Sequence, residues 1–391
     1  VTDQSRLEIV VDQVKMREAW VHNLHAHRPP ESLEGMGFTL PLVAAAIDVS
    51  DFDDSPEDYF RTKYPFQIRG TDAQDVGGPC IQFMTHVARE QHSSKDAGSP
   101  LFTPSHNVTM RSLQSDQSYY VPNPNCSSPY YLRLYRALGI LIGSALFAKI
   151  NLYFAWPRLG WMRLLGHEPT EADLDQVCKD EVRFANEMSE RDLDALYEAD
   201  EDTFITWTRF NMLSQKVDLE PQGDERRLVN AERQQWRDAF IISLLAEGAP
   251  QWAAIRQGLR LVVPHDVLEL LKWSELRLLV CGEHRISVNA LIEHSIVDSE
   301  VELQAEWLWE YLRGESDARR AKFLQFTTGR ACVPPGDAEW PFRVHVAAGS
   351  SDVCVPGSAT CFAKISLPTT SDRELFLRLL TLALDQPLEF N

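Results

Sequence analysis

The residues of this sequence that are best suited to covalent chemistry are its cysteines. The seven cysteines are scattered, odd in number and without CxxC spacing: Cys80, Cys126, Cys178, Cys281, Cys332, Cys354 and Cys361. This pattern suits free thiols in a reducing compartment better than a disulfide framework. Small and polar residues precede Cys361 and a strand pattern follows it at 362–367. We therefore expect its sulfur at a loop–strand junction, where a macromolecular substrate could reach it.

The chemistry of Cys361 alone leaves two interpretations open. A reactive cysteine acts as the thiolate, which an exposed position and a neighbouring cation favour, and Lys364 is the nearest cation in the sequence. A structural cysteine needs neither of these features. Residue types around the thiol do not decide between the two.

Signatures of several other enzyme classes are missing. The sequence contains no GxxxxGK[ST] loop, no GxGxxG, no HExxH and no GxSxG. His22, His25 and His27 are close in sequence, but no cysteine or carboxylate completes a metal-ligand set, which favours a solvated helix end. We expect no metal site and no cofactor.

The composition is that of a globular protein and restricts its partners. The chain has 391 residues, 44% hydrophobic and 24% charged, enough for two or more structural units. The net charge of -19 argues against a nucleic-acid partner, which needs clustered Lys and Arg, and against an anionic membrane. The same charge would attract a basic partner.

The apolar segments indicate buried helices rather than targeting or membrane segments. The most apolar run, 137–148, is flanked by Arg133, Arg136 and Lys149 and is too short to cross a bilayer. Residues 1–14 are rich in charge and lack the apolar core of a signal peptide. We expect a cytoplasmic protein, which could also be nuclear.

Periodicity predicts a mainly helical larger unit followed by a short α+β unit at the C-terminus, so the fold class is α+β. Apolar spacing of three and four predicts a helix at 128–150, and further helices are expected at 80–90, 156–165, 231–244, 303–312 and 320–327, with two short helices within 265–281. Alternation and β propensity predict strands at 7–11, 65–69, 341–347 and 362–367. Capping boxes are predicted at Thr170/Asp173, Ser189/Asp192 and Ser371/Glu374, the last before a final helix.

A family resemblance is carried first by the residues around Cys361. Thr360-Cys361-Phe362, followed by Leu367-Pro368, resembles the active-site segment of HECT-type ubiquitin ligases, which reads H-T-C-F-N, three variable residues and L-P. Two positions depart from that pattern: Ala359 stands where many relatives have His, and Ala363 replaces the common Asn.

Further segments resemble the same family and occur in its order along the chain. They are Asp75–Pro79, Leu101–Pro104, Tyr131–Leu146 with Gly139 and Gly143, Leu278–Gly282, Trp307–Trp309, Phe323–Gly329 and Val333–Pro334. Each match is weak alone, but together they identify the chain, from about residue 7 to its end, as a member of the HECT family. Substrate-recruiting domains of such ligases usually precede the catalytic part, so we expect this chain to be part of a longer protein.

The resemblance implies a two-lobe HECT fold, in which a mainly helical N-lobe precedes a small α/β C-lobe. The N-lobe would span 1–282, with a subdomain at about 175–240 that binds a ubiquitin-conjugating enzyme. The C-lobe would span 286–391 and carry Cys361. A hinge at 283–285, with Gly282, Glu283, His284 and Arg285 as hinge residues, would let the C-lobe swing.

The chemistry that the resemblance implies is ubiquitin transfer. Cys361 would accept ubiquitin from the conjugating enzyme as a thioester and pass it to a substrate lysine, with Thr360 and Phe362 in supporting roles. The lysine must lose a proton, because its ordinary pKa is about 10.4, and Glu389 and Asp385 are candidate acceptors. Thr360 would position the thiol or the oxyanion, although simple turn chemistry explains it equally well.

Docking of the conjugating enzyme is expected in an apolar groove. The segment Val229–Trp236 resembles the family's T-N-E-N-R-x-x-[FY], so Trp236 matches an aromatic that lines the groove, and Phe204 falls at another groove position. Large exposed aromatics suit interface anchors. The alternative interpretation is that Trp236 and Phe204 are both core residues of a small subdomain. The expected partners are a conjugating enzyme, ubiquitin and a protein substrate, with no nucleic acid and no membrane.

Three other functions compete with a ligase. A catalytically inactive scaffold with the HECT fold would bind ubiquitin or a conjugating enzyme without transfer, and the loss of His at position 359 is the argument for it. A papain-like protease needs a His paired with the Cys, and His345 is the only histidine after Ser295. A plain binding module is disfavoured, because the chain resembles a catalytic domain almost from end to end.

Overall fold

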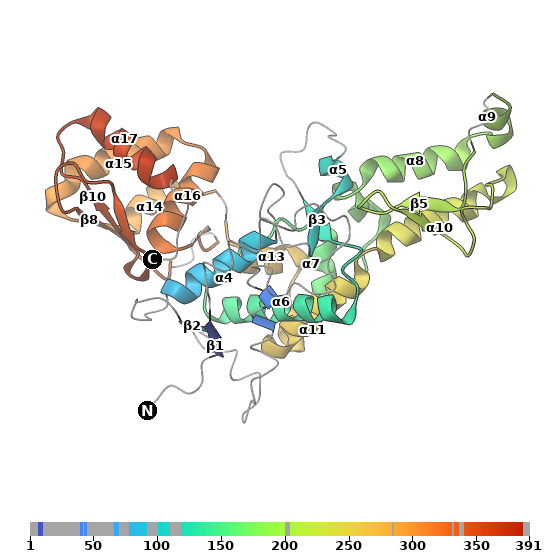
Figure 1. Ribbon diagram of the computed structural model, residues 1–391, viewed down its shortest axis with the longest axis horizontal. Coiled ribbons are helices and arrows are strands. Elements are labelled where there is room, and N and C mark those ends of the chain that lie inside the picture. The colour runs from blue at the N-terminus through green and yellow to red at the C-terminus, as the bar shows by residue number, and fades with distance from the viewer. Residues whose placement is uncertain are drawn as a thin grey trace.

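Helices dominate the structure, and the strands form small sheets (Figure 1). The computed structural model describes residues 7–10, 40–41, 43–44, 66–69, 78–91, 101–109, 119–199, 204–283, 285–330, 332–335 and 340–385. The α+β class predicted from periodicity agrees with this content. None of the helices in the described ranges has the length and apolarity needed to cross a membrane.

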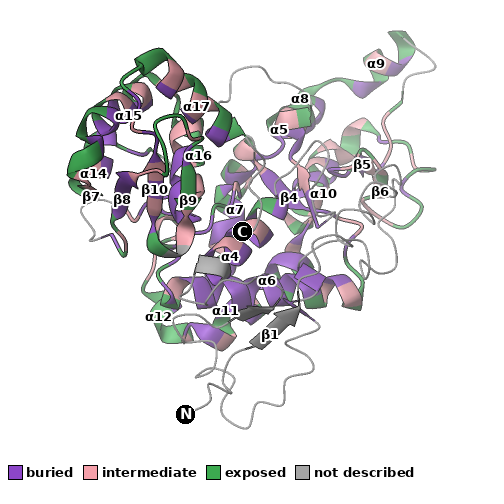
Figure 2. Ribbon diagram, turned by 60° about the vertical axis from the view of Figure 1, so that its left-hand side comes forward, coloured by how far each residue is buried: buried purple, intermediate pink, exposed green. Residues whose placement is uncertain are grey.

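The largest core is built around two long helices, α6 (Pro129–Phe147) and α11 (Ala249–Val262). A Cβ added at Gly139 would overlap the carbonyl oxygen of Ile255, and one at Gly258 would overlap that of Arg136. The two backbones therefore touch, because glycines stand where any side chain would separate the helices. Trp156, Trp161 and Trp252 pack beside this contact and are almost completely buried. Figure 2 shows α6 in the buried colour along much of its length.

Shorter elements cover this helix pair. The helices are α4 (Gly78–Glu90), α5 (His106–Thr109), α7 (Arg158–Leu165), α12 (His265–Glu269) and α13 (Trp273–Cys281). The strands β1 (Leu7–Val10) and β2 (Phe66–Arg69) pair in parallel, and β3 (Phe102–Pro104) pairs antiparallel with β4 (Tyr120–Pro122). The predicted helix at 128–150 and the strands at 7–11 and 65–69 are thereby confirmed to within a few residues.

A second core joins α8 (Lys179–Glu190), α9 (Leu193–Ala199) and α10 (Arg233–Ala246) to the antiparallel pair β5 (Thr208–Phe210) and β6 (Lys216–Asp218). Short 3-10 turns at Glu171–Gln176 and Asn230–Glu232 connect these elements. Figure 1 shows α8, α9 and α10 extending away from the α6–α11 pair. His106 of α5 pairs with Glu181 of α8 and so joins this extension to the larger core, and Arg209 forms a buried ion pair with Glu247 at the end of α10.

A third core lies in residues 286–384. Its sheet has the order β7 (Ser295–Val297), β8 (Val344–Ala348), β10 (Lys364–Leu367), β9 (Gly357–Ala359), with β9 antiparallel to β10 and the other neighbours parallel. A 3-10 turn at Ser299–Val301 follows β7. The helices are α14 (Val288–Glu293), α15 (Glu302–Gly314), α16 (Asp317–Thr328) and α17 (Arg373–Asp385). The lobe boundaries inferred from the family resemblance stay a prediction.

Several local predictions need correction. The capping box of Thr170 and Asp173 is confirmed, but α17 is capped by Asp372, whose carboxylate accepts from the N–H groups of Glu374 and Leu375. The Ser189 box is wrong because α8 continues to Glu190. Helix α11 was not predicted, since its sequence contains Pro250 and Gly258, which usually interrupt helices. Pro250 lies in the first turn, where a missing N–H costs nothing.

The α6–α11 contact predicts an unequal effect of two glycine substitutions. Gly258→Ala should lower the free energy of unfolding by about 1–3 kcal/mol, because the new methyl group collides with backbone that cannot retreat. Gly314→Ala is the control, since a Cβ at the end of α15 meets nothing within 4 Å. Urea denaturation followed by circular dichroism measures both. Equal urea midpoints for the two variants would mean that α6 and α11 can move apart at no cost in free energy.

Candidate active site

Cys361 lies in a tight connection between two strands. Residues Thr360–Phe362 form a 3-10 turn, η4, between β9 and β10, and Ala359 pairs with Lys364 across the hairpin. The N–H of Ala363 donates to the carbonyl oxygen of Thr360 at 3.2 Å and closes the turn. The predicted strand at 362–367 therefore begins only at Lys364. The side chain of Cys361 is outside the described part of the chain.

The turn is anchored from one side and open on the other. Ile365 and Leu367 of β10 are fully buried, whereas Phe362 keeps 69% of its surface exposed. Alternating side chains of a strand point to opposite faces, so β10 fixes the turn on the core while the turn faces outward. Thr360, Cys361 and Phe362 thus lie together at an accessible corner of the sheet, as the loop–strand expectation required.

Ala363 holds an uncommon backbone conformation in this turn. Its φ is 49°, in the left-handed region that costs a residue with a Cβ roughly 1–2 kcal/mol. Asparagine, the family's common residue, adopts this region more readily than alanine. Alanine at this position therefore makes the turn more strained than asparagine would.

Polar groups approach the turn from two directions. The side-chain amide Nε2 of Gln82, on α4, donates to Oγ1 of Thr360 at 2.7 Å. On the neighbouring strand β8, the backbone N–H of His345 donates to the carbonyl oxygen of Ala363, and its imidazole Nε2 lies 2.9 Å from Oδ1 of Asp298. Sequence reasoning missed Gln82, because no local pattern links it to a residue 278 positions away.

The other described cysteines differ from an exposed nucleophile. Cys80, Cys126, Cys178, Cys281 and Cys332 are buried. Burial raises the pKa of the Cys126 and Cys281 thiols to about 12 and raises that of Cys178 and Cys332 as well. A thiol with a raised pKa is rarely a thiolate at neutral pH and is a poor nucleophile. Cys354 is half-buried, and its thiol donates to the carbonyl oxygen of Ser351 at 3.2 Å.

Of the two candidate proton acceptors, Glu389 and Asp385, only Asp385 lies among the described residues. Asp385, at the end of α17, is paired with Arg319, and the hydrogen bond from that guanidinium lowers the pKa of the carboxyl. A carboxylate with a lowered pKa is a weaker base, so this pairing argues against Asp385 as the group that deprotonates a lysine.

The expected hinge residues lie between the first and third cores. Gly282, at the end of α13, has φ 65°, and a Cβ there would collide with the carbonyl oxygen of Val333. Glu283 and Val333 exchange two backbone hydrogen bonds, of 2.9 and 3.3 Å. Arg285 is exposed, and His284 lies outside the described residues. The positive φ explains why glycine is needed at position 282.

The two expected docking aromatics are placed differently. Phe204 is 57% exposed, as an interface residue should be, but Trp236 has no exposed surface. The indole Nε1 of Trp236 donates to the carbonyl oxygen of Thr206 at 3.0 Å, and its ring packs against Phe240. The expectation of an exposed Trp236 is wrong, because the ring fills the core between α8 and α10. The alternative, a core residue of the subdomain, describes it correctly.

Other large apolar side chains are exposed on the same subdomain. They are Phe184, Phe210, Val229 and Ile242. The ring of Phe184 lies over Trp236 and Phe240, with centroid distances of 6.1 and 6.3 Å. Sequence analysis missed these residues. A sequence signal for such residues is an apolar residue that falls outside the buried stripe of its helix. Ile242 on α10 is an example, because it is exposed although the preceding residue, Ile241, is buried.

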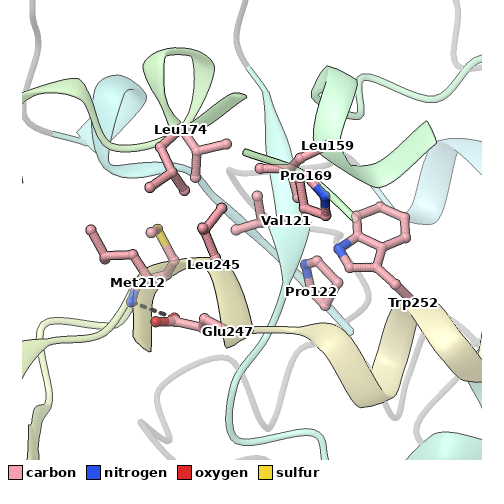
Figure 3. A pocket seen from close by; sticks show the side chains of 11 residues that line it. Val121, Pro122, Leu159, Pro169, Leu174, Met212, Leu245, Glu247 and Trp252 are labelled. Carbon is pink, nitrogen blue, oxygen red and sulfur yellow. Dashed lines mark hydrogen bonds between the residues drawn. The ribbon is translucent and has the colours of Figure 1, made fainter. Parts of the chain in front are cut away.

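A pocket lies where the first and second cores meet (Figure 3). Its lining is almost entirely apolar: Val121, Pro122, Leu159, Pro169, Leu174, Val177, Met212, Leu244, Leu245, Glu247 and Trp252. The one lining carboxylate, of Glu247, accepts from the N–H of Met212 at 2.9 Å and is paired with Arg209. These structural interactions use the carboxylate oxygens of Glu247, so the pocket offers no free group for catalysis. Over the described residues, no cluster of three or more His, Cys, Asp or Glu could hold a metal ion.

The strained turn at Ala363 predicts opposite effects of two alanine-to-glycine changes. Ala363→Gly should raise the free energy of unfolding by up to about 1 kcal/mol, because glycine adopts a positive φ without strain. Ala359→Gly, four residues earlier (φ -128°), should lower it by about 0.5–1 kcal/mol. Thermal unfolding of both variants tests this. A loss of stability in both would show that the turn carries no strain that glycine relieves.

Comparison with known proteins identifies the family to which this chain belongs. A family model described as HECT-domain (ubiquitin-transferase) matches residues 92–391. The E3 ubiquitin-protein ligase HERC2 of Mus musculus is 28% identical over 78% of this chain and 6% of its own length. The Apoptosis-resistant E3 ubiquitin protein ligase 1 of Homo sapiens is 26% identical over 98% and 46%, and the E3 ubiquitin-protein ligase HUWE1 of Mus musculus is 26% identical over 85% and 8%. The chain spans less than half the length of each of these relatives, and it belongs to the HECT family of ubiquitin transferases.

Proposed function

We propose that this chain is the catalytic domain of a ubiquitin ligase that accepts ubiquitin on Cys361 as a thioester and transfers it to a lysine of a protein substrate. The observation that carries this proposal is the position of Cys361 in the open η4 turn, beside the exposed Phe362. Membership of a family of ubiquitin transferases and the burial of five other thiols support it.

The proposed reaction is two acyl transfers. The Cys361 thiolate attacks the thioester carbonyl of the charged conjugating enzyme, a new C–S bond forms, and that enzyme's cysteine leaves as a thiolate. A thioester replaces a thioester, so the step is nearly neutral in energy. A neutral lysine amine then attacks the Cys361 thioester, an isopeptide bond forms and the Cys361 thiolate leaves. In this proposal Glu389 accepts the lysine proton and Thr360 stabilises the oxyanion.

A two-lobe arrangement suits this reaction. We assign residues 1–282 to an N-lobe, 283–285 to a hinge and 286–391 to a C-lobe. The separate core of residues 286–384 and the positive φ of Gly282 support that division. In Figure 1 the C-terminal unit and helices α8–α10 lie at opposite ends of the molecule, so ubiquitin bound beside α10 reaches Cys361 only if the units reorient.

The conjugating enzyme is proposed to dock on the exposed apolar side chains of the second core. Phe204, Phe210 and Ile242 would supply contacts, and Trp236 would support Phe184 from beneath. Ubiquitin and a protein substrate are the other proposed partners. The net charge of -19 supports a function without nucleic acid or membrane. The scattered cysteines suit a reducing compartment, and the cytoplasm or the nucleus is the proposed location. An inactive scaffold is the alternative, and the alanine at position 359 is the residue that favours it.

A single-turnover assay tests the role of Cys361. Wild-type protein mixed with a ubiquitin-charged conjugating enzyme should give a band one ubiquitin heavier on a non-reducing gel, and reductant should remove it. Cys361→Ala should give no such band. Cys354→Ala is the matched control, because Cys354 is the described cysteine that is not buried, and it should load as the wild type does. A band that survives in Cys361→Ala identifies another acceptor. No band with any conjugating enzyme of a broad panel favours the scaffold.

The burial of the docking aromatics predicts two distinct defects. Phe204→Ala should raise the concentration of conjugating enzyme needed for half-maximal loading by about tenfold or more, with an unchanged unfolding midpoint. Trp236→Ala should instead lower the midpoint, at a cost of about 3–5 kcal/mol, because it empties a core site. Leu270→Ala is the control, since Leu270 is 83% exposed and lies at the end of α12, outside the second core. It should change neither the loading concentration nor the unfolding midpoint. Normal loading by Phe204→Ala would remove Phe204 from the interface.

A further inference from the structure

The turn that contains Cys361 rests against a helix from the first third of the chain. The amide Nε2 of Gln82, in the first half of α4, donates to Oγ1 of Thr360 at 2.7 Å. Both side chains are partly buried, which limits competition from water. The residue that accepts this hydrogen bond is the immediate neighbour of Cys361, so α4 acts directly on the proposed catalytic segment.

Further contacts hold Gln82 at this distance from the turn. The Nη1 group of Arg330 donates to the carbonyl oxygen of Lys149 at 2.9 Å, which joins the end of α16 to the end of α6. Gly329 (φ 74°) lies against Gln82, and a Cβ there would be only 3.0 Å from the Cγ of Gln82. The backbone pair of Glu283 and Val333 is a third connection between the two units. The Gln82–Thr360 bond is therefore one contact of an ordered junction.

The direction of this hydrogen bond decides what the hydroxyl can do. An amide nitrogen only donates, so Oγ1 of Thr360 is the acceptor, and the hydroxyl hydrogen is left for a second partner. A hydroxyl that accepts a hydrogen bond also becomes a stronger donor, because linked hydrogen bonds polarise one another. Gln82 thereby turns the Thr360 proton away from α4 and makes it available within η4.

We propose that Gln82 is a positioning residue for the second transfer: it holds the Thr360 hydroxyl so that it donates to the thioester carbonyl oxygen on Cys361 while a lysine attacks. The inference rests on the proposed function of Cys361. The lysine nitrogen bonds to the carbonyl carbon, and the carbonyl electron pair moves to oxygen, which the Thr360 O–H stabilises without giving up its proton. The C=O bond then re-forms, the C–S bond breaks, and the ammonium proton passes to a base or to water.

The arrangement assigns this contact to lysine transfer rather than to loading. Helices α8–α10, where the conjugating enzyme is proposed to dock, lie at the far end of the molecule from the η4 turn while the turn contacts α4 (Figure 1). We expect loading on Cys361 in a different arrangement of the units, in which the hydrogen bond between Gln82 and Thr360 is broken. A substitution of Gln82 should therefore change discharge and leave loading unchanged.

A chase experiment separates these two steps. The full chain is charged on Cys361, further charging is stopped, and free lysine is added while the reducible band is followed over time. Gln82→Leu should load at the wild-type rate and discharge about tenfold more slowly. Gln257→Leu is the matched control, because Gln257 is exposed on α11, and it should behave as the wild type does in both steps.

Gln82→Glu tests the direction of the hydrogen bond with a side chain of the same size. At neutral pH the carboxylate can only accept, so it would draw the Thr360 proton toward α4, and discharge should be as slow as in Gln82→Leu. Lowering the pH should recover part of the rate relative to the wild type as the carboxyl becomes protonated and can donate. Wild-type discharge by Gln82→Glu at neutral pH would overturn the proposal.

A double substitution distinguishes positioning from a structural role. Thr360→Val should discharge about a hundredfold more slowly, and adding Gln82→Leu to it should cause no further loss, because Gln82 acts only through the hydroxyl. A further tenfold loss in the double variant would mean that Gln82 only stabilises the fold. Wild-type discharge by Gln82→Leu after normal loading overturns this inference alone. Failure of the wild type to load on Cys361 overturns the proposed function and the inference with it.

Discussion

The contact between the backbones of α6 and α11 is the interaction on which the other parts of the structure depend. Glycines at 139 and 258 let the helices meet without side chains between them. The α11 helix follows α10 through Gly248, whose φ is 74°, so the proposed docking subdomain extends from one partner of the pair. The α6 helix ends near Lys149, whose carbonyl oxygen accepts from Arg330 of the C-terminal unit. Both proposed functional regions are thus connected to one pair of closely packed helices.

Ion pairs hold the proposed docking subdomain together and connect it to the larger core. Arg209 of β5 pairs with Glu247 just after α10, and the same carboxylate holds the N–H of Met212. His106 of α5 pairs with Glu181 of α8; burial opposes protonation of the imidazole, but this hydrogen bond raises the pKa of His106. Loss of one member of a buried pair leaves the other charge without compensation, which is more costly than any gain from forming the pair. Such pairs specify one geometry more than they add stability.

The proposed catalytic turn combines exposure with restraint. Its open side presents Phe362, and its closed side is anchored by the buried residues of β10 and by the hydrogen bond from Gln82. In the proposed function, Cys361 is reached first by the charged conjugating enzyme and then by the substrate, so the turn cannot be covered. It must also hold its carbonyl in a fixed orientation, because transition-state stabilisation depends on donors that are already in place. An accessible turn on a packed strand meets both requirements.

The sequence by itself predicted those features that depend on neighbouring residues. The helices expected at 128–150, 231–244, 303–312 and 320–327 match α6, α10, α15 and α16 within a few residues. The small and polar residues before Cys361 and the strand pattern after it predicted a cysteine at a loop–strand junction. These predictions succeed because a helical face or a turn depends on residues close in the chain. Helix α11 was missed, since its Pro250 and Gly258 resemble breaks until the first turn and the partner helix are known.

Only the tertiary structure decided which side chains meet across long sequence separations. Trp236 and Phe204 have the same apolar chemistry, yet one is fully buried and the other exposed, because α8 packs over the first and leaves the second uncovered. Gln82 and Thr360 are 278 positions apart, and no local pattern marks either as a partner of the other. The residue types determine which hydrogen bonds and contacts are possible, but the packing of elements distant in sequence determines which of them form.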